Sequence, residues 1–182
     1  MRPDTKEYLV QVALHIAIMC VAAGICLLMV YALVSGASSG QGSIYTSFFP
    51  SVHSIENISH DLSPRGDTPD VKQIYRALDA RGELLGYGVD VVPTGFGGPL
   101  PMHIAFHTDG SVLGIKFGEH KETDGLGSGV AEADFYAQFL GKRPPVTLFG
   151  DIQAISGATL SSQAVVHGVN QASRAIGTSP KP

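Results

Sequence analysis

The chain has 182 residues and a formal net charge of −4, and its length favours a single domain, at roughly 100–200 residues per domain. An acidic balance without a cluster of Lys and Arg argues against a nucleic-acid-binding protein. The only two cysteines, Cys20 and Cys26, lie in an apolar run at a spacing that matches no zinc or iron–sulfur pattern. We therefore expect neither a disulfide nor a cysteine-bound metal in the rest of the chain.

Residues 10–34 are predicted to form a transmembrane helix. The nineteen residues from Ile16 to Val34 carry no charge, and as a helix they extend about 28 Å, close to the hydrocarbon thickness of a bilayer. The alternative is a cleaved secretory signal with a small-residue site at 35–37, but the apolar run is longer than the usual signal core. An uncleaved anchor is the favoured interpretation.

The positive charges predict how this helix is oriented. Arg2 and Lys6 precede it, and no Lys or Arg follows before Arg65. Because Lys and Arg concentrate on the cytoplasmic side, residues 1–9 are expected in the cytoplasm. The rest of the chain is then expected on the extracytoplasmic side of the cell (inner) membrane, as a single-pass protein.

Residues 35–69 are rich in Ser, Gly, Asp and Pro, which is typical of a linker, with room for one short strand. A globular domain is expected over 70–177, followed by a tail over 178–182. Its first element is predicted as a helix beginning at Asp70, because four apolar residues share one helical face: Val71, Ile74, Tyr75 and Leu78.

Three strands are predicted next, over Leu84–Val92, Met102–Phe106 and Val112–Phe117, and an Asp109-Gly110 turn makes the last two a hairpin. A short helix over Ala131–Leu140 should bury two phenylalanines. A longer helix over Ser161–Ile176 is predicted from apolar residues at three- and four-residue spacing. Together these elements indicate an α+β domain with a mainly antiparallel, twisted sheet and flanking helices.

The residues before the last helix suggest an anion site. A helix N-terminus offers unpaired backbone N–H groups and the positive end of the helix dipole, which suit a phosphate. Gly157 and Ala158 leave room for close approach, and hydroxyl groups stand around them at Ser156, Thr159, Ser161 and Ser162. From spacing alone, an ordinary Ser/Thr helix cap remains open as the alternative.

Ser156-Gly-Ala-Thr159, followed by Leu160 and a pair of serines, resembles the flavinylation motif of the FMN-binding subunits of the Rnf and Na⁺-translocating NADH:quinone reductase complexes. The resemblance implies that Thr159 bears FMN through a phosphoester bond. It also implies that a flavin transferase installs the FMN from FAD, outside the cytoplasm in bacteria.

Upstream, His120-Lys-Glu122-Thr123-Asp124-Gly125-Leu126-Gly127 resembles the family's H-x-E-T-P-G-L-G loop, which packs against the flavin. The chain departs from that pattern at Asp124, where the family has proline. This departure implies a less rigid loop and a carboxylate that disfavours the reduced flavin anion. The resemblance covers residues 70–176, and the short linker is more similar to the Rnf G subunit than to the longer reductase subunit.

The expected role is therefore an electron carrier within a membrane-bound, ion-translocating Rnf-type complex, rather than an enzyme with its own catalytic residues. Other subunits of the complex, the flavin transferase and the bilayer are the expected partners. Two alternatives stay open: a stand-alone membrane FMN protein serving another respiratory reductase, and a non-redox extracytoplasmic binding or assembly module.

The pair His103 and His107 is not expected to bind a metal, because on a strand these imidazoles lie about 13 Å apart.

Overall fold

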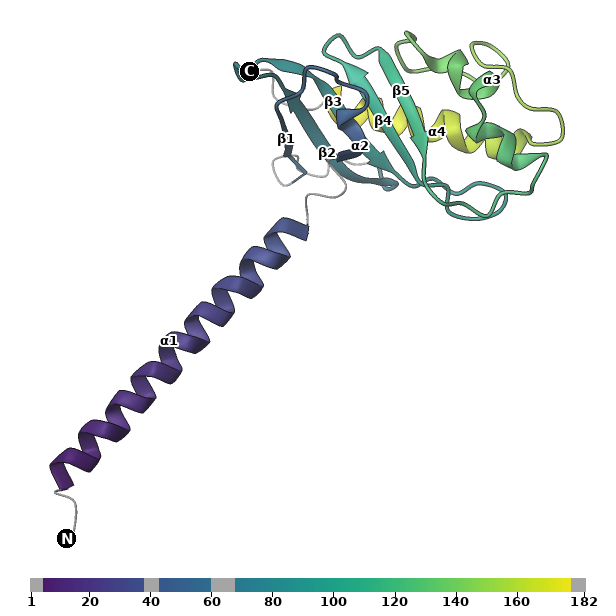
Figure 1. Cartoon of the computed structure of the whole chain (residues 1–182). Helices are drawn as coiled ribbons and strands as arrows, with labels where there is room; N and C mark the ends of the chain where they lie inside the picture. Colours follow the sequence, from purple (N-terminus) through teal and green to yellow (C-terminus); the bar gives the residue numbers. More distant parts are fainter. Residues whose placement is uncertain (1–4, 38–42, 60–67, 178–182) are drawn as a thin grey trace. The chain divides into compact units, whose positions relative to one another are not determined.

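The computed structural model describes residues 5–37, 43–59 and 68–177. It divides into two units, Met1–Gln41 and Gly42–Pro182 (Figure 1). The first unit contains helix α1 (Thr5–Ala37), whose side chains are described at Gln11 and from Leu14 to Met29. The second unit contains all the other helices and strands of the described residues.

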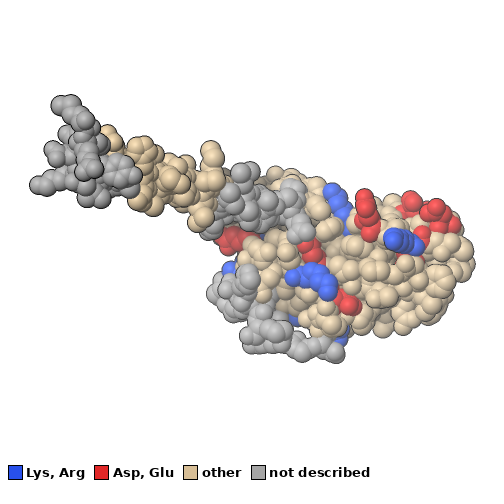
Figure 2. Space-filling model, turned by 90° about the horizontal axis from the view of Figure 1, so that it is seen from below, with Lys and Arg blue, Asp and Glu red and all other residues tan. Residues whose placement is uncertain are grey.

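Large apolar side chains of α1 are exposed throughout its described part, and no charged residue lies among them (Figure 2). Leu27 and Met19 are 76% and 72% exposed. In the part of the chain that the structure describes, no helix has both the length and the apolar character needed to cross a bilayer. The span predicted over 10–34 includes side chains outside the described ones.

The second unit is built on a five-stranded antiparallel sheet in the order β1-β2-β3-β4-β5. Each strand pairs with its neighbour in sequence, and short turns connect β2 to β3 and β4 to β5. A hairpin turn at Gly110 joins the last two strands. Gly110 has φ +83°, a left-handed conformation that glycine adopts easily because it has no Cβ. The strands are β1 (Ser54–Asn57), β2 (Val71–Leu78), β3 (Leu84–Val91), β4 (Met102–His107) and β5 (Val112–Phe117).

One face of the sheet packs against the C-terminal helix α4 (Thr159–Gly177), which lies behind the strands in Figure 1. Alternate residues of the central strands, such as Val89 and Ile104, are fully buried there with Val165 and Val169 of the helix. The helix buries its apolar stripe and exposes Gln163, His167 and Arg174. The main core therefore lies between α4 and the middle of the sheet.

The other face is covered by helix α2 (Ser43–Thr46) and the residues that follow it. Here aromatic rings lie directly on glycines of the sheet: a Cβ on Gly88 would come within 2.5 Å of the Tyr45 ring. A Cβ on Gly86 would likewise overlap the Phe49 ring, and one on Gly114 the Phe48 ring. The three glycines are therefore needed to seat this aromatic layer.

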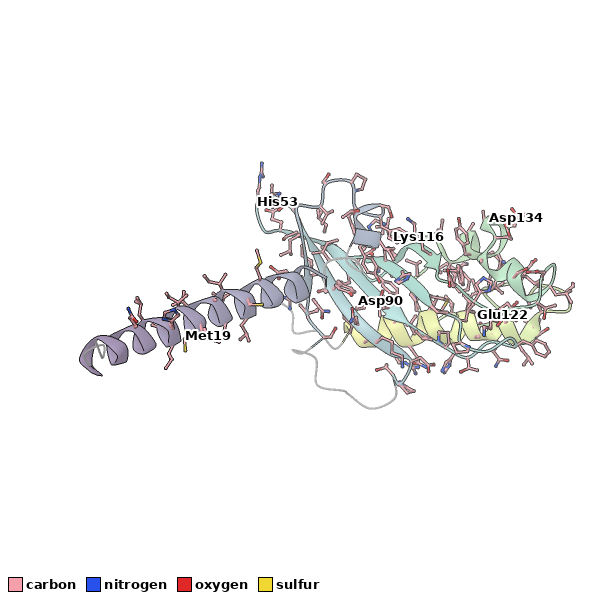
Figure 3. All side chains as sticks on the ribbon, turned by 60° about the horizontal axis from the view of Figure 1, so that its bottom comes forward. Met19, His53, Asp90, Lys116, Glu122 and Asp134 are labelled. Carbon is pink, nitrogen blue, oxygen red and sulfur yellow. The ribbon has the colours of Figure 1, made fainter. Side chains whose placement is uncertain are left out.

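A buried carboxylate lies beneath the same layer. Asp90 Oδ1 accepts a hydrogen bond from the Tyr45 hydroxyl at 2.5 Å and lies 2.7 Å from His103 Nδ1. Asp90 and His103 face each other in the register of β3 and β4. Burial, together with the Asp90 charge, raises the pKa of Tyr45 well above its ordinary value. This cluster fastens α2 to β3 and β4; Asp90 is labelled in Figure 3.

The prediction of strands over Leu84–Val92, Met102–Phe106 and Val112–Phe117 is confirmed to within one residue. The prediction for Ala131–Leu140 is confirmed in outline: helices α3 (Ala133–Tyr136) and η2 (Ala137–Phe139) bury Phe135 and Phe139. The C-terminal helix is also confirmed and begins two residues earlier than predicted.

One other prediction is wrong. Residues 71–78 form strand β2 rather than a helix, since Ile74 and Tyr75 are buried on opposite faces of the sheet between two partner strands. The segment predicted as linker over 35–69, with room for one short strand, contains the strand β1 and also the helix α2, which was not predicted. Its residues Tyr45 and Phe49 are buried against the sheet.

Candidate functional site

The N-terminus of α4 forms the centre of the candidate site. The helix begins at Thr159, directly after a turn in which the Ala158 N–H donates to the Ile155 carbonyl at 2.9 Å. Gly157 has φ +80°, a conformation that glycine adopts without strain. Because the first-turn N–H groups of a helix have no intrahelical acceptor, this end can hold a negatively charged group.

The hydroxyl groups around this turn divide into two kinds. Ser162 is fully buried; its Oγ donates to the Ala158 carbonyl at 2.9 Å and accepts the Ile155 N–H at 3.1 Å. Ser161 is also buried and donates to Glu122. Thr159 and Ser156 are exposed. The two serines of the helix therefore hold its first turn in place, while the Thr159 hydroxyl is open to a ligand.

The loop after β5 meets this helix end. In Thr123–Leu126 the Leu126 N–H donates to the Thr123 carbonyl at 3.1 Å and Gly125 has φ +74°, which is the pattern of a type II turn. The turn places Leu126 against the opposite turn, since a Cβ on Gly157 would lie 3.2 Å from Leu126 Cδ2. Helix η1 (Gly127–Ala131) follows and packs against α4.

Glu122 joins three segments at the base of the site. It is only 6% exposed. Its Oε1 accepts the Gly97 N–H at 3.0 Å, and its Oε2 accepts the Ser161 hydroxyl at 2.5 Å. A Cβ on Gly127 would come within 2.5 Å of Glu122 Oε2, so the backbone of η1 also closes on this carboxylate. Figure 3 shows Glu122 beside α4.

These segments enclose a cavity of about 430 Å³, within the range of small-molecule and cofactor sites. Its large apolar residues are Phe96, Leu126 and Leu160, and Thr159 also lines it. The complete lining is Phe96, Thr123, Leu126, Gly127, Gly157, Ala158, Thr159, Leu160 and Ser161.

The structure thus brings most of the predicted site residues to one cavity. Gly125, Ser156 and Ser162 lie outside the lining, and Glu122 supports it from below. Sequence reasoning missed Phe96, which lies between β3 and β4. The signal that could have found it was a large aromatic residue within a run of glycines, Gly95-Phe96-Gly97-Gly98, a pattern that by itself indicates only a turn.

Residues 95–174 match the FMN-binding domain family. The matched region begins at the loop that carries Phe96 and includes both loops of the cavity and most of α4. This part of the chain is therefore similar to an FMN-binding domain.

The chain is also similar to G subunits of ion-translocating complexes. It is 32% identical over 114 residues to the G subunit of the proton-translocating ferredoxin:NAD(+) oxidoreductase complex of Clostridium ljungdahlii, covering 59% of this chain and 62% of that protein. It is 34% identical over 103 residues to the G subunit of the ion-translocating oxidoreductase complex of Methanosarcina acetivorans, covering 54% and 55%. The chain thus spans between half and two thirds of the length of these relatives.

A solved structure shares the fold. The C subunit of the Na(+)-translocating NADH-quinone reductase of Parabacteroides distasonis superposes with a TM-score of 0.52 over 72% of this chain and 80% of that one. The two sequences are 20% identical, so this likeness concerns the fold alone.

The residues around the cavity fit FMN. The helix end suits the phosphate, and apolar side chains suit the planar ring. The described residues include no group of three or more His, Cys, Asp or Glu placed to hold a metal ion.

Proposed function

We propose that the FMN of this domain is covalently attached, through a phosphoester bond to the Thr159 hydroxyl. The observation that carries this proposal is the division of the hydroxyls at the start of α4. Ser161 and Ser162 are buried and hydrogen bonded, whereas Thr159 is exposed, lines the cavity and begins the helix. An ester at this position would place the phosphate beside the free N–H groups of the first turn.

The protein would act as an electron-carrying subunit of a membrane-bound, ion-translocating Rnf-type complex. Bound FMN supplies the capacity to accept and release one or two electrons, while the protein positions it and tunes its potential. The similarity to G subunits named for such complexes supports this role. Other subunits would then be its electron-transfer partners and would move the ion, and a flavin transferase would act on Thr159 during maturation.

Helix α1 would attach the protein to the cell membrane, with Gly42–Pro182 on the extracytoplasmic side. The support is the ring of exposed apolar side chains from Leu14 to Met29, since a helix that is apolar all round is normally buried in protein or lipid. The sidedness rests on Arg2 and Lys6. Protease treatment of intact spheroplasts tests it: degradation of the domain is expected, and protection until lysis would contradict the orientation.

The intact mass of the chain tests the covalent attachment. The protein is purified from its native host, or from a host that contains the flavin transferase, and denatured before measurement. The expected mass is that of the polypeptide plus one FMN less one water. The bare polypeptide mass would overturn the proposal.

A matched pair of variants locates the bond. Thr159→Ala should lose the added mass and the flavin fluorescence that otherwise survives denaturation. Ser156→Ala removes another exposed hydroxyl, three residues upstream, and should keep both. Retention of the FMN mass in Thr159→Ala would show that another residue carries the cofactor.

A further inference from the structure

Phe96 is a large apolar side chain that the fold leaves exposed beside the cavity. It is 69% exposed, whereas every large apolar residue within the five strands is buried or half-buried. It shares the cavity with Leu126 and Leu160, which are 46% and 60% exposed. Exposed apolar groups that gather at one concave place commonly mark a ligand surface.

The backbone on either side of Phe96 is held in a tight turn. Thr94 and Pro99 form a β-bridge, and the Gly95 N–H donates to the Gly98 carbonyl at 2.7 Å. Gly98 has φ +119°, which a residue with a side chain rarely adopts. Phe96 therefore stands near the tip of a short and conformationally restricted hairpin.

This hairpin is also locked to the loop that follows β5. Its Gly97 N–H donates to Glu122, and a Cβ on Gly95 would overlap the same carboxylate. A Cβ on Gly97 would overlap the Lys121 carbonyl oxygen. With both glycines pressed against a neighbouring loop, Phe96 cannot turn into the protein without breaking these contacts. Its exposure at the cavity is imposed by the fold.

We propose that Phe96 is a cofactor-contact residue, which packs its ring against the isoalloxazine ring of FMN attached at Thr159. This inference rests on the proposed function. An aromatic side chain suits the role because it offers a large, rigid and polarisable surface to a planar ring. The contact would restrict the ring of a flavin that Thr159 tethers only through its phosphate.

Substitution by tyrosine tests the contact directly. Tyrosine is more easily oxidised than phenylalanine and quenches flavin emission by electron transfer when the two rings touch. The native Phe96→Tyr protein should therefore lose most of its flavin fluorescence relative to the wild type and regain it on denaturation. Phe149→Tyr is the matched control: Phe149 is 74% exposed and lies outside the cavity lining, so its emission should be unchanged.

Intact mass is measured on the same samples, so that two failures can be distinguished. If wild type and Phe96→Tyr both carry FMN but emit equally, Phe96 does not touch the ring, and covalent attachment stands. If the wild type from a flavinylating host carries no FMN, the proposed function fails and the role of Phe96 fails with it. Equal quenching in Phe96→Tyr and Phe149→Tyr would also overturn the contact.

Discussion

Glu122 Oε2 and Ser161 Oγ are 2.5 Å apart, in a hydrogen bond that joins the loop after β5 to the first turn of α4. The other carboxylate oxygen accepts the Gly97 N–H from the hairpin between β3 and β4. Three segments distant in sequence therefore meet at one buried side chain. Because each of them contributes to the cavity, its shape depends on this one carboxylate.

Glu122→Gln tests that dependence. The substitution keeps the size of the side chain but replaces one carboxylate oxygen by an NH₂ group. The amide oxygen can still accept the Gly97 N–H, but the Ser161 hydroxyl must turn from donor to acceptor. The free energy of unfolding should fall by about 1 kcal/mol, because hydrogen bonds to a charged carboxylate are stronger than those to a neutral amide. Urea unfolding of the full chain measures it. Glu119→Gln, an exposed change three residues away, should stay within about 0.5 kcal/mol of wild type; equal losses in both would contradict the linking role.

Gly127 and Gly129 provide a matched pair within helix η1. A Cβ on Gly127 would lie 2.5 Å from Glu122 Oε2 and 3.0 Å from Ser161 Oγ, both buried, whereas one on Gly129 would lie 3.2 Å from the flexible end of Ile155. Gly127→Ala should therefore cost about 1–3 kcal/mol of stability, as overpacking commonly does, and Gly129→Ala much less. Thermal unfolding of the two variants makes the comparison, and a larger loss for Gly129→Ala would refute it.

Asp124 occupies the second position of the turn Thr123–Leu126, with Gly125 third at φ +74°. This is the position that favours proline in a type II turn, and the family resemblance also places proline there. Asp124→Pro should raise the free energy of unfolding by about 0.4–1 kcal/mol, since it restricts the unfolded chain. Asp124→Ala removes the carboxylate without adding the ring and is the control. Urea unfolding measures both, and a proline variant less stable than the alanine variant would contradict this turn geometry.

The hydroxyl of Tyr75 predicts how stability changes in alkali. Burial, and then the nearby Asp90 charge, raises the pKa of Tyr75 to about 12, from 10.0. Above pH 10 the unfolded tyrosine loses its proton while the folded one keeps it, so the free energy of unfolding should fall between pH 10 and about 12. In Tyr75→Phe this fall should be shallower. Urea midpoints across that range measure the slope, with Tyr136→Phe as a control outside the Asp90 cluster; an unchanged slope in Tyr75→Phe would contradict the assignment.

Elements with one strong pattern were predictable from sequence. Strands β3, β4 and β5 and helix α4 each show a clear period of apolar residues, and each is found within a residue or two of its predicted bounds. The segment 71–78 was not predictable in this way. Its apolar residues fit one face of a helix as well as they fit a strand. Pairing with β1 and β3, which the local sequence does not show, makes it a strand.

The candidate site was predicted unevenly for a similar reason. The loops at 122–127 and 156–162 were found from a family pattern, and the fold brings them to one cavity. The Ser161 hydroxyl donates to Glu122, 39 positions away along the chain. Glu122 also accepts the N–H of Gly97, 25 positions away, and so holds the hairpin that carries Phe96. No local pattern contains such contacts, so only the folded chain reveals which hydroxyl is free.

The aromatic rings that rest on Gly86, Gly88 and Gly114 have a mechanical consequence. They fasten the first residues of the domain to β3, β4 and β5, and not to the β1 edge alone. A tension applied at residue 43 would therefore be distributed over several strands at once, instead of peeling them away one by one. The first residues of the domain are in this sense attached to several strands and not to a single one.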